Sequence, residues 1–83
     1  ETVFKFISNI NNKIKFDIIF MDPPYKEDKI NKLLGLIFEK KILKHNGLLI
    51  IHRNKKTKDE FPINYKIILD RTYGLSRIFF GKL

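Results

Sequence analysis

The sequence predicts an α/β fold, built from a strand–helix–strand unit and a terminal antiparallel hairpin. Two continuous apolar runs, at 18–21 and 48–51, are typical of strands that are buried on both faces. Between them, apolar residues recur with helical spacing over 30–38. Strand, helix and strand in this order form a right-handed βαβ unit with parallel strands. Near the C-terminus, a Tyr-Gly turn separates two more apolar segments.

The first half of the chain is predicted to begin with a short helix. Apolar residues at helical spacing predict this helix over 2–11, and Asn-Asn-Lys at 11–13 predicts a turn after it. A strand at 16–21 follows and ends before two prolines, which cannot continue a sheet ladder. The second helix is expected from 30 to about 43. It should stop at the His-Asn-Gly sequence at 45–47, because Asn and Gly favour helix ends.

The second half of the chain completes the predicted sheet. Its segments are a strand at 48–51, a charged loop at 53–60, and strands at 66–72 and 76–80. The tight turn at Tyr73-Gly74 makes the last two strands antiparallel. Two central parallel strands would leave one apolar edge bare. We therefore expect a further strand beside 16–21, which this chain does not contain.

The length and composition restrict the class of protein. The 83 residues make at most one small domain, and a hydrophobic fraction of 43% predicts a globular chain. The absence of cysteine excludes disulfides and thiolate metal sites and fits a reducing cytoplasm. No apolar run reaches membrane-spanning length. Because the chain begins at Glu1 and not at a methionine, we expect a fragment or a processed product.

The chain is strongly basic, with a net charge of +8. This charge implies attraction to a polyanion, either nucleic acid or an anionic membrane surface. A lysine-rich composition from an AT-rich genome would give the same excess. Cations in the loops after the two parallel strands could contact RNA phosphates, or they could simply keep the surface soluble. These candidate phosphate contacts are Lys26, Lys29, Arg53, Lys55, Lys56 and Lys58.

The stretch Asp22-Pro23-Pro24-Tyr25 follows the first buried strand, at the sheet edge where open α/β proteins bind ligands. The amine of a nucleic-acid base is a poor nucleophile, because its lone pair is delocalised into the ring. The Asp22 carboxylate and a carbonyl of the proline segment could accept hydrogen bonds from the two N–H groups and favour a tetrahedral nitrogen. Tyr25 offers a ring on which the base can stack. A methyl sulfonium held in line would complete a direct transfer without a metal.

Simpler interpretations exist for these residues. Asp-Pro-Pro could merely terminate the strand, with Tyr25 as an ordinary boundary aromatic. We favour the functional interpretation because the tetrapeptide follows a buried strand of a βαβ unit. Neither His45 nor His52 has a second ligand at metal spacing, so no metal site is predicted. His52 is expected to face the same crevice as the tetrapeptide, although a solvated strand end explains it more simply.

Residues 16–25 resemble motif IV of the class I, S-adenosylmethionine-dependent amino-methyltransferases, the Asp/Asn-Pro-Pro-Tyr/Phe group. The segment 68–76, followed by Ile-Phe-Phe at 78–80, resembles the end of the RsmD family, the bacterial 16S rRNA guanine-N2 methyltransferases. A strand, a Tyr-Gly turn and a final strand close that family. Val-Phe-Lys-Phe-Ile at 3–7, followed by the motif strand, also matches its order. The resemblance covers nearly all of this chain, but only the C-terminal half of a family member.

The resemblance implies the C-terminal part of a Rossmann-like class I methyltransferase sheet. That sheet has the order 3-2-1-4-5-7-6, and this chain would supply strands 4, 5, 6 and 7. Residues 1–83 would then be the C-terminal half of one domain, without the cofactor-binding half and inactive alone. For the full-length protein, the resemblance implies S-adenosylmethionine as cofactor and 16S rRNA or the small ribosomal subunit as partner. It also implies no membrane or metal partner, a cytoplasmic location and a monomer.

The resemblance also implies roles for individual residues. It implies that Asp22, Pro23, Pro24 and Tyr25 are catalytic, and that Asp22 also lies near the methyl donor. A DNA adenine-N6 methyltransferase shares the tetrapeptide and is an alternative, although the C-terminal hairpin argues against it. The other alternative is a non-catalytic, basic nucleic-acid-binding module that merely keeps the turn.

Overall fold

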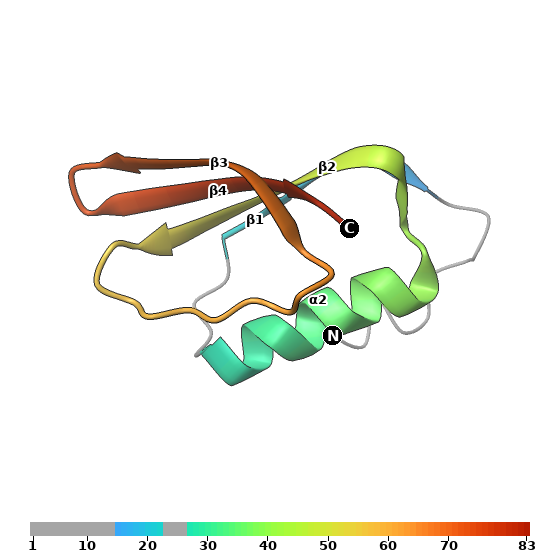
Figure 1. Cartoon of the computed structure of the whole chain (residues 1–83), viewed down its shortest axis with the longest axis horizontal. Helices are drawn as coiled ribbons and strands as arrows, with labels where there is room; N and C mark the ends of the chain where they lie inside the picture. The colour runs from blue at the N-terminus through green and yellow to red at the C-terminus, as the bar shows by residue number, and fades with distance from the viewer. Residues whose placement is uncertain (1–14, 23–26) are drawn as a thin grey trace.

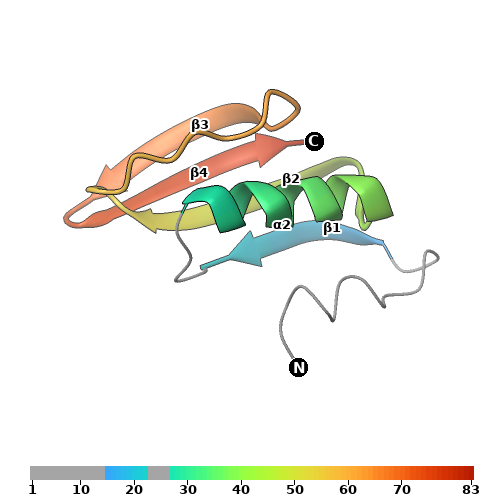
Figure 2. The ribbon, with the colours of Figure 1, turned by 90° about the horizontal axis from the view of Figure 1, so that it is seen from below.

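The computed structural model describes residues 15–22 and 27–83, which form a sheet with one helix packed on one face (Figures 1 and 2). The helix predicted at 2–11 and the turn at 11–13 lie outside the described residues. The described elements are β1 (Phe16–Met21), α2 (Glu27–Lys40), β2 (Leu43–Asn54), β3 (Lys66–Tyr73) and β4 (Ser76–Lys82). All four predicted strands are present, so the predicted α/β fold is confirmed.

The sheet has the order β1-β2-β4-β3. Strands β1 and β2 are parallel and are joined by α2, whereas β4 is antiparallel to both β2 and β3. This arrangement confirms the predicted βαβ unit and the terminal hairpin. It also matches the expected order 4-5-7-6, because the last strand lies between the second and the third. Within the described part of the chain, β1 therefore forms one edge of the sheet.

The predicted end of the second helix is wrong. Helix α2 ends at Lys40, and Lys41 has a left-handed backbone with φ of 53°. The Lys41 N–H donates to the Phe38 carbonyl (3.2 Å), and the Ile42 N–H donates to the Ile37 carbonyl (3.4 Å). These two bonds form a Schellman motif, which is closed by the apolar contact of Ile37 and Ile42 in the core. A lysine at the left-handed position gives no sequence signal of the glycine or asparagine type.

The sequence at 45–47 lies inside strand β2, where it forms a bulge and not a helix stop. Asn46 has a left-handed φ of 64°. From the pair Phe16–Leu43 to the pair Ile18–Leu48, the register advances two residues in β1 and five in β2. Gly47 is required in this bulge, because a Cβ there would lie 2.8 Å from the backbone carbonyl oxygen of Lys44. The predicted helix stop at 45–47 is therefore wrong, because these turn-forming residues make a bulge inside a strand.

Burial of the strands differs from the expectation of two covered faces. In β1, Ile18 and Phe20 are 62% and 61% exposed, whereas Met21 is buried. Strand β2 alternates in the same way, with Ile51 buried and Ile50 only half-buried. The reason is that α2 covers only one face of the described sheet (Figure 2). Alternate side chains of each strand therefore point toward α2, and the others point away from it.

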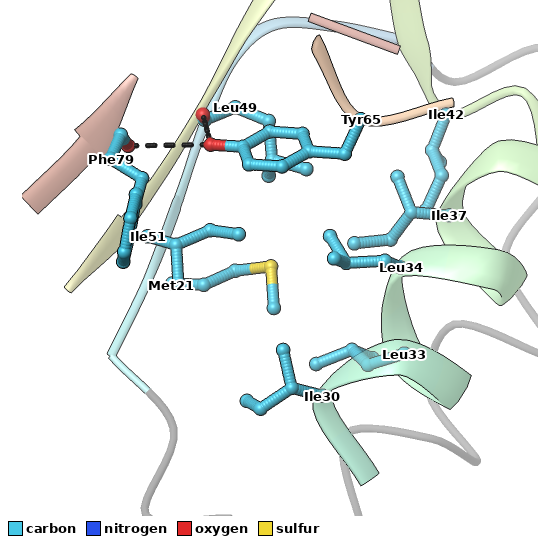
Figure 3. Close-up of a cluster of buried hydrophobic side chains, with 10 residues drawn as sticks. All are labelled: Met21, Ile30, Leu33, Leu34, Ile37, Ile42, Leu49, Ile51, Tyr65 and Phe79. Atoms are coloured by element: carbon cyan, nitrogen blue, oxygen red, sulfur yellow. Dashed lines mark hydrogen bonds between the residues drawn. The ribbon is translucent and has the colours of Figure 1, made fainter. Parts of the chain in front are cut away.

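The core lies between α2 and the sheet (Figure 3). Its side chains are Met21, Ile30, Leu33, Leu34, Ile37, Ile42, Leu49, Ile51, Tyr65 and Phe79. The Tyr65 hydroxyl donates to the carbonyl of Leu49 (2.9 Å), and the Phe79 carbonyl lies 3.4 Å from it. Burial raises the pKa of the Tyr65 phenol. In the described part of the chain, no helix is long and apolar enough to cross a membrane.

Candidate active site

The carboxyl ends of β1 and β2 bring Asp22 and His52 together. Met21 pairs with Ile51 in the parallel ladder; Asp22 follows Met21 just past the end of β1, and His52 follows Ile51 within β2. The Nδ1 atom of His52 lies 2.9 Å from Oδ1 of Asp22. Because Met21 and Ile51 point toward α2, the alternation of side chains directs Asp22 and His52 to the opposite face.

The two side chains differ in their exposure to solvent. The Asp22 side chain is 62% exposed, whereas that of His52 is only 30% exposed. An ionised carboxylate can only accept hydrogen bonds, so the contact requires a proton on Nδ1 of His52. The carboxylate then has one oxygen, Oδ1, bound to the ring, and no other described residue donates to Oδ2. This arrangement can hold an amine at the edge of the sheet.

Asp22 is the only member of the predicted catalytic tetrapeptide that the structure describes. Pro23, Pro24 and Tyr25 lie outside the described residues, so their roles stay predictions. Lys26, a predicted phosphate contact, also lies outside them. Lys29 lies in the first turn of α2 and is exposed. It belongs to the N-terminal end of α2, which comes after the carboxyl end of β1 in the chain.

The other predicted phosphate contacts belong to the segment that leaves β2. Lys55, Lys56 and Lys58 are exposed. The segment is a defined turn: the Lys56 N–H donates to Asn54 Oδ1 (2.9 Å), and the Thr57 N–H donates to the Asn54 carbonyl (3.0 Å). Since the turn begins at the carboxyl end of β2, its lysines come directly after the edge of the sheet at which Asp22 lies.

Arg53 differs from these lysines because it is buried, with 5% of its side chain exposed. Its guanidinium binds the equally buried Asp59 through two hydrogen bonds, Nε–Oδ2 at 2.8 Å and Nη2–Oδ1 at 3.1 Å. Such a bidentate pair fixes both partners. The pair ties the segment after β2 to the end of the strand, and the predicted contact of Arg53 with RNA stays a prediction.

The described residues at this edge contain no metal-binding cluster. Among the described residues, no group of three or more His, Cys, Asp or Glu side chains could hold a metal ion. A hollow of about 410 Å³ lies at the other end of the sheet, where it is lined by Lys15, Phe38, Lys44 and Leu83 among others. None of the predicted site residues lines it.

The contact between Asp22 and His52 had a signal in the sequence. Each residue directly follows a four-residue apolar run, 18–21 or 48–51. If the two runs pair in parallel and in register, the residues after them become neighbours. The register itself depends on the bulge in β2, at residues for which the sequence predicts a helix end.

A family model described as Conserved hypothetical protein 95 matches residues 1–82 of the chain. The chain belongs to this family, the RsmD family. The predicted family membership is thereby confirmed. An uncharacterised methylase of Rickettsia prowazekii is 33% identical over 70 residues, which cover 84% of this chain and 29% of the relative. The ribosomal RNA small subunit methyltransferase D of Haemophilus influenzae is 27% identical over 75 residues, covering 90% of this chain and 39% of the relative.

Solved structures share the fold of this RsmD-family chain. A crystal structure of a Haemophilus influenzae protein matches 98% of the chain with a TM-score of 0.77 at 23% identity, and 50% of its own length is covered. A conserved hypothetical protein of Streptococcus pyogenes gives the same TM-score at 20% identity, with 96% of this chain and 50% of the other covered. The chain thus spans about half the length of these structures and 29% and 39% of the two curated relatives above.

Proposed function

We propose that the full-length protein containing this chain methylates the exocyclic N2 amine of a guanine in 16S rRNA, with S-adenosylmethionine as methyl donor. The observation that carries the proposal is the Asp22 carboxylate, which is exposed at the carboxyl end of β1 with one oxygen bound to His52. Family membership and the names of the relatives support the reaction class. The guanine amine, the cofactor and the 16S rRNA substrate are the proposed details.

In this proposal, the chain supplies the face of the site that holds the base. Asp22 accepts a hydrogen bond from one N–H of the amine, and a carbonyl of the Pro23-Pro24 segment accepts one from the other. Tyr25 stacks on the base after it has been turned out of the RNA. The amine nitrogen is thereby held with its lone pair directed at the incoming methyl carbon, so that catalysis depends mainly on positioning.

The described residues contain no glycine-rich turn of the kind that would bind S-adenosylmethionine. The chain has four glycines, which lie in α2, in the β2 bulge, in the β3–β4 turn and in β4. None forms a glycine-rich turn between a strand and a helix, which is the usual device for binding a nucleotide cofactor. We therefore propose that this chain is the C-terminal half of the catalytic domain and is inactive alone. The exposed apolar side chains of Ile18 and Phe20 on edge strand β1 support this view.

The proposed partner is 16S rRNA, free or in the small ribosomal subunit. We propose that three exposed cations contact its phosphates, because the segments that carry them come after the carboxyl ends of β1 and β2, as Asp22 does. These cations are Lys29, Lys55 and Lys56. Lys26 is proposed for the same role from its position in the sequence. We further propose a cytoplasmic, monomeric enzyme.

The test uses the full-length protein, cofactor with a radioactive methyl group, and 16S rRNA or small subunits from cells that lack the enzyme. Asp22→Ala should lower the rate of labelling by about 100-fold or more, because it removes an acceptor that positions the nucleophile. Asp17→Ala is the matched control. Asp17 lies at the other end of β1, where its side chain is 79% exposed, and this variant should keep wild-type activity.

Three outcomes would contradict the proposal. Labelling of duplex DNA alone would indicate an adenine-N6 methyltransferase. Absence of labelling of any nucleic acid by protein that binds RNA would favour a non-catalytic binding module. Full activity of Asp22→Ala would exclude the proposed role of the carboxylate.

A further inference from the structure

We propose that His52 is a positioning residue for the Asp22 carboxylate: the imidazole binds Oδ1 and thereby orients Oδ2 toward the amine of the substrate. This inference rests on the proposed function, because it assigns to Asp22 the task of holding a base amine. His52 does not touch the substrate in this scheme. It acts through Asp22 alone.

The backbone of His52, the hydrogen-bond donor, is held more firmly than that of Asp22, the acceptor. His52 is the last-but-two residue of β2, whose backbone is paired on both sides, with Met21–Ile51 in β1 and His52–Ile78 in β4. Asp22 lies just past the end of β1 and has no partner strand on its other side in the described sheet. The half-buried ring can therefore restrain the exposed carboxylate, whose side chain would otherwise sample several rotamers.

The hydrogen bond also gives the two carboxylate oxygens of Asp22 different partners. Oδ1 receives the Nδ1–H of His52 at 2.9 Å. Among the described residues, none donates to Oδ2, so this oxygen can accept a donor from a substrate, such as one N–H of a base amine. A carboxylate held in this way meets the amine in one orientation, so less ordering is required when the substrate binds.

Stability of the fold does not explain the contact. The Asp22 side chain is 62% exposed, and exposed ion pairs or hydrogen bonds of this kind contribute little to folding. Arg53, the next residue, points to the opposite face, where it is bound to Asp59. Consequently, the strand presents a histidine and not an arginine to Asp22. A neutral imidazole donates one hydrogen bond there without placing a permanent positive charge beside the site.

The test compares His52→Asn and His52→Leu in the full-length enzyme. The amide N–H of asparagine can replace the Nδ1–H donor, whereas leucine fills similar space without a donor. We expect His52→Leu to lower kcat about 10- to 100-fold, with KM for RNA and Kd for the cofactor changed less than about twofold. His52→Asn should recover most of the lost kcat. His45→Leu is the control and should behave like the wild type, because His45 is an exposed residue at the other end of β2.

The outcomes separate this inference from the proposed function. If the wild-type enzyme does not methylate RNA, the proposed function fails. If the wild type is active, Asp22→Ala is inactive and His52→Leu retains full activity, only the role of His52 is excluded. Equal losses in His52→Asn and His52→Leu would also exclude it, because the hydrogen bond would not be the cause.

A measurement on the wild-type protein avoids any effect of the variants on folding. Nitrogen-15 NMR of the histidine rings at alkaline pH distinguishes the two neutral tautomers. We expect His52 to carry its proton on Nδ1, and we expect Asp22→Ala to shift the population toward the Nε2–H form. A wild-type ring with its proton on Nε2 would overturn the proposal.

Discussion

Tyr65 connects three segments of the chain through one buried side chain. Its hydroxyl donates to the carbonyl of Leu49 in β2, close to the carbonyl of Phe79 in β4 (Figure 3). Its ring packs edge-on against Phe61 with the centroids 5.3 Å apart. Gly81 leaves room for this ring, because a Cβ at that position would lie 2.6 Å from the Tyr65 Cε1 atom. A tyrosine before a strand thus acts as a core residue with one polar contact.

We predict that Tyr65→Phe destabilises the protein by about 1–2 kcal/mol, because it removes a buried hydroxyl that satisfies a buried carbonyl. Tyr73→Phe should change the free energy of unfolding by less than about 0.5 kcal/mol, since the Tyr73 side chain is 63% exposed. Urea unfolding of the full-length protein measures both values. Equal stability of the two variants would show that the Tyr65 hydrogen bond contributes nothing.

At the scale of elements, the end of β2 is anchored by a buried ion pair. Arg53 and Asp59 hold the segment that contains Lys55, Lys56 and Lys58 against the strand. The Lys55 N–H also donates to the Leu75 carbonyl in the β3–β4 turn, at 2.7 Å. This lysine-rich segment is therefore connected to two parts of the sheet.

Asp59→Asn should destabilise the protein by about 3 kcal/mol, because it removes the negative charge beside a buried guanidinium. The control is Asp70→Asn. The side chains of Asp70 and Arg77, which form an ion pair, are 37% and 40% exposed, so this variant should lower the free energy of unfolding by less than about 1 kcal/mol. Thermal or urea unfolding of the full-length protein gives both values. If the two variants lose equal stability, the buried pair has no special role.

The Asp70 pair also has a defined pH dependence. The hydrogen bond from the Arg77 guanidinium lowers the pKa of Asp70 in the folded state. Its small contribution is therefore present above the unfolded pKa of about 4 and is lost as the pH falls below it.

The sequence was sufficient to predict that the four strands exist. It was insufficient to predict where α2 ends and β2 begins. Continuous apolar runs predict strands, although only alternate residues of these runs are buried in the described sheet, and the Tyr73-Gly74 turn predicts an antiparallel pair. The helix end at Lys40 depends on a left-handed lysine, whose conformation its side chain does not favour. Asn46 and Gly47 were recognised as left-handed or turn-forming residues, but such residues suit a bulge as well as a helix end.

The candidate site was predictable to a similar degree. The position of Asp22 at the end of an apolar strand follows from the sequence alone. Its contact with His52 depends on the register between two strands, which local patterns do not determine. The burial of Arg53 was not predictable from its charge, because it depends on Asp59 folding back toward the same strand.

At the scale of the whole molecule, the net charge of +8 is combined with lysines at both ends of the sheet. In the proposed enzyme, only the lysines near the carboxyl ends of β1 and β2 contact RNA. The others contribute a general attraction that is not specific to position. These two contributions differ in their dependence on salt.

Replacing Lys55, Lys56 and Lys58 by glutamine should weaken RNA binding and reduce the slope of log K against log salt by about 0.7–0.9 for each lost phosphate contact. The control replaces three lysines on α2 and β3, namely Lys32, Lys40 and Lys66, with the same change in net charge. It should leave the slope nearly unchanged. Filter binding at several salt concentrations measures both, and equal slopes for the two triple variants would indicate that the basic charge acts only as a whole.

The bulge in β2 has a consequence for the chemistry at the far end of the strand. Side chains alternate between the two faces of a strand. Because β2 advances five residues across the bulge while β1 advances two, the faces to which the later residues of β2 point are exchanged relative to a regular ladder. This reversal directs Arg53 toward α2 and His52 toward Asp22. With the same sequence, a bulge one residue longer would exchange the two, so that Arg53 would lie beside the carboxylate and a permanent cation would replace the imidazole. The number of residues between Leu43 and Leu48 thus selects the neighbour of Asp22, although none of those residues touches it.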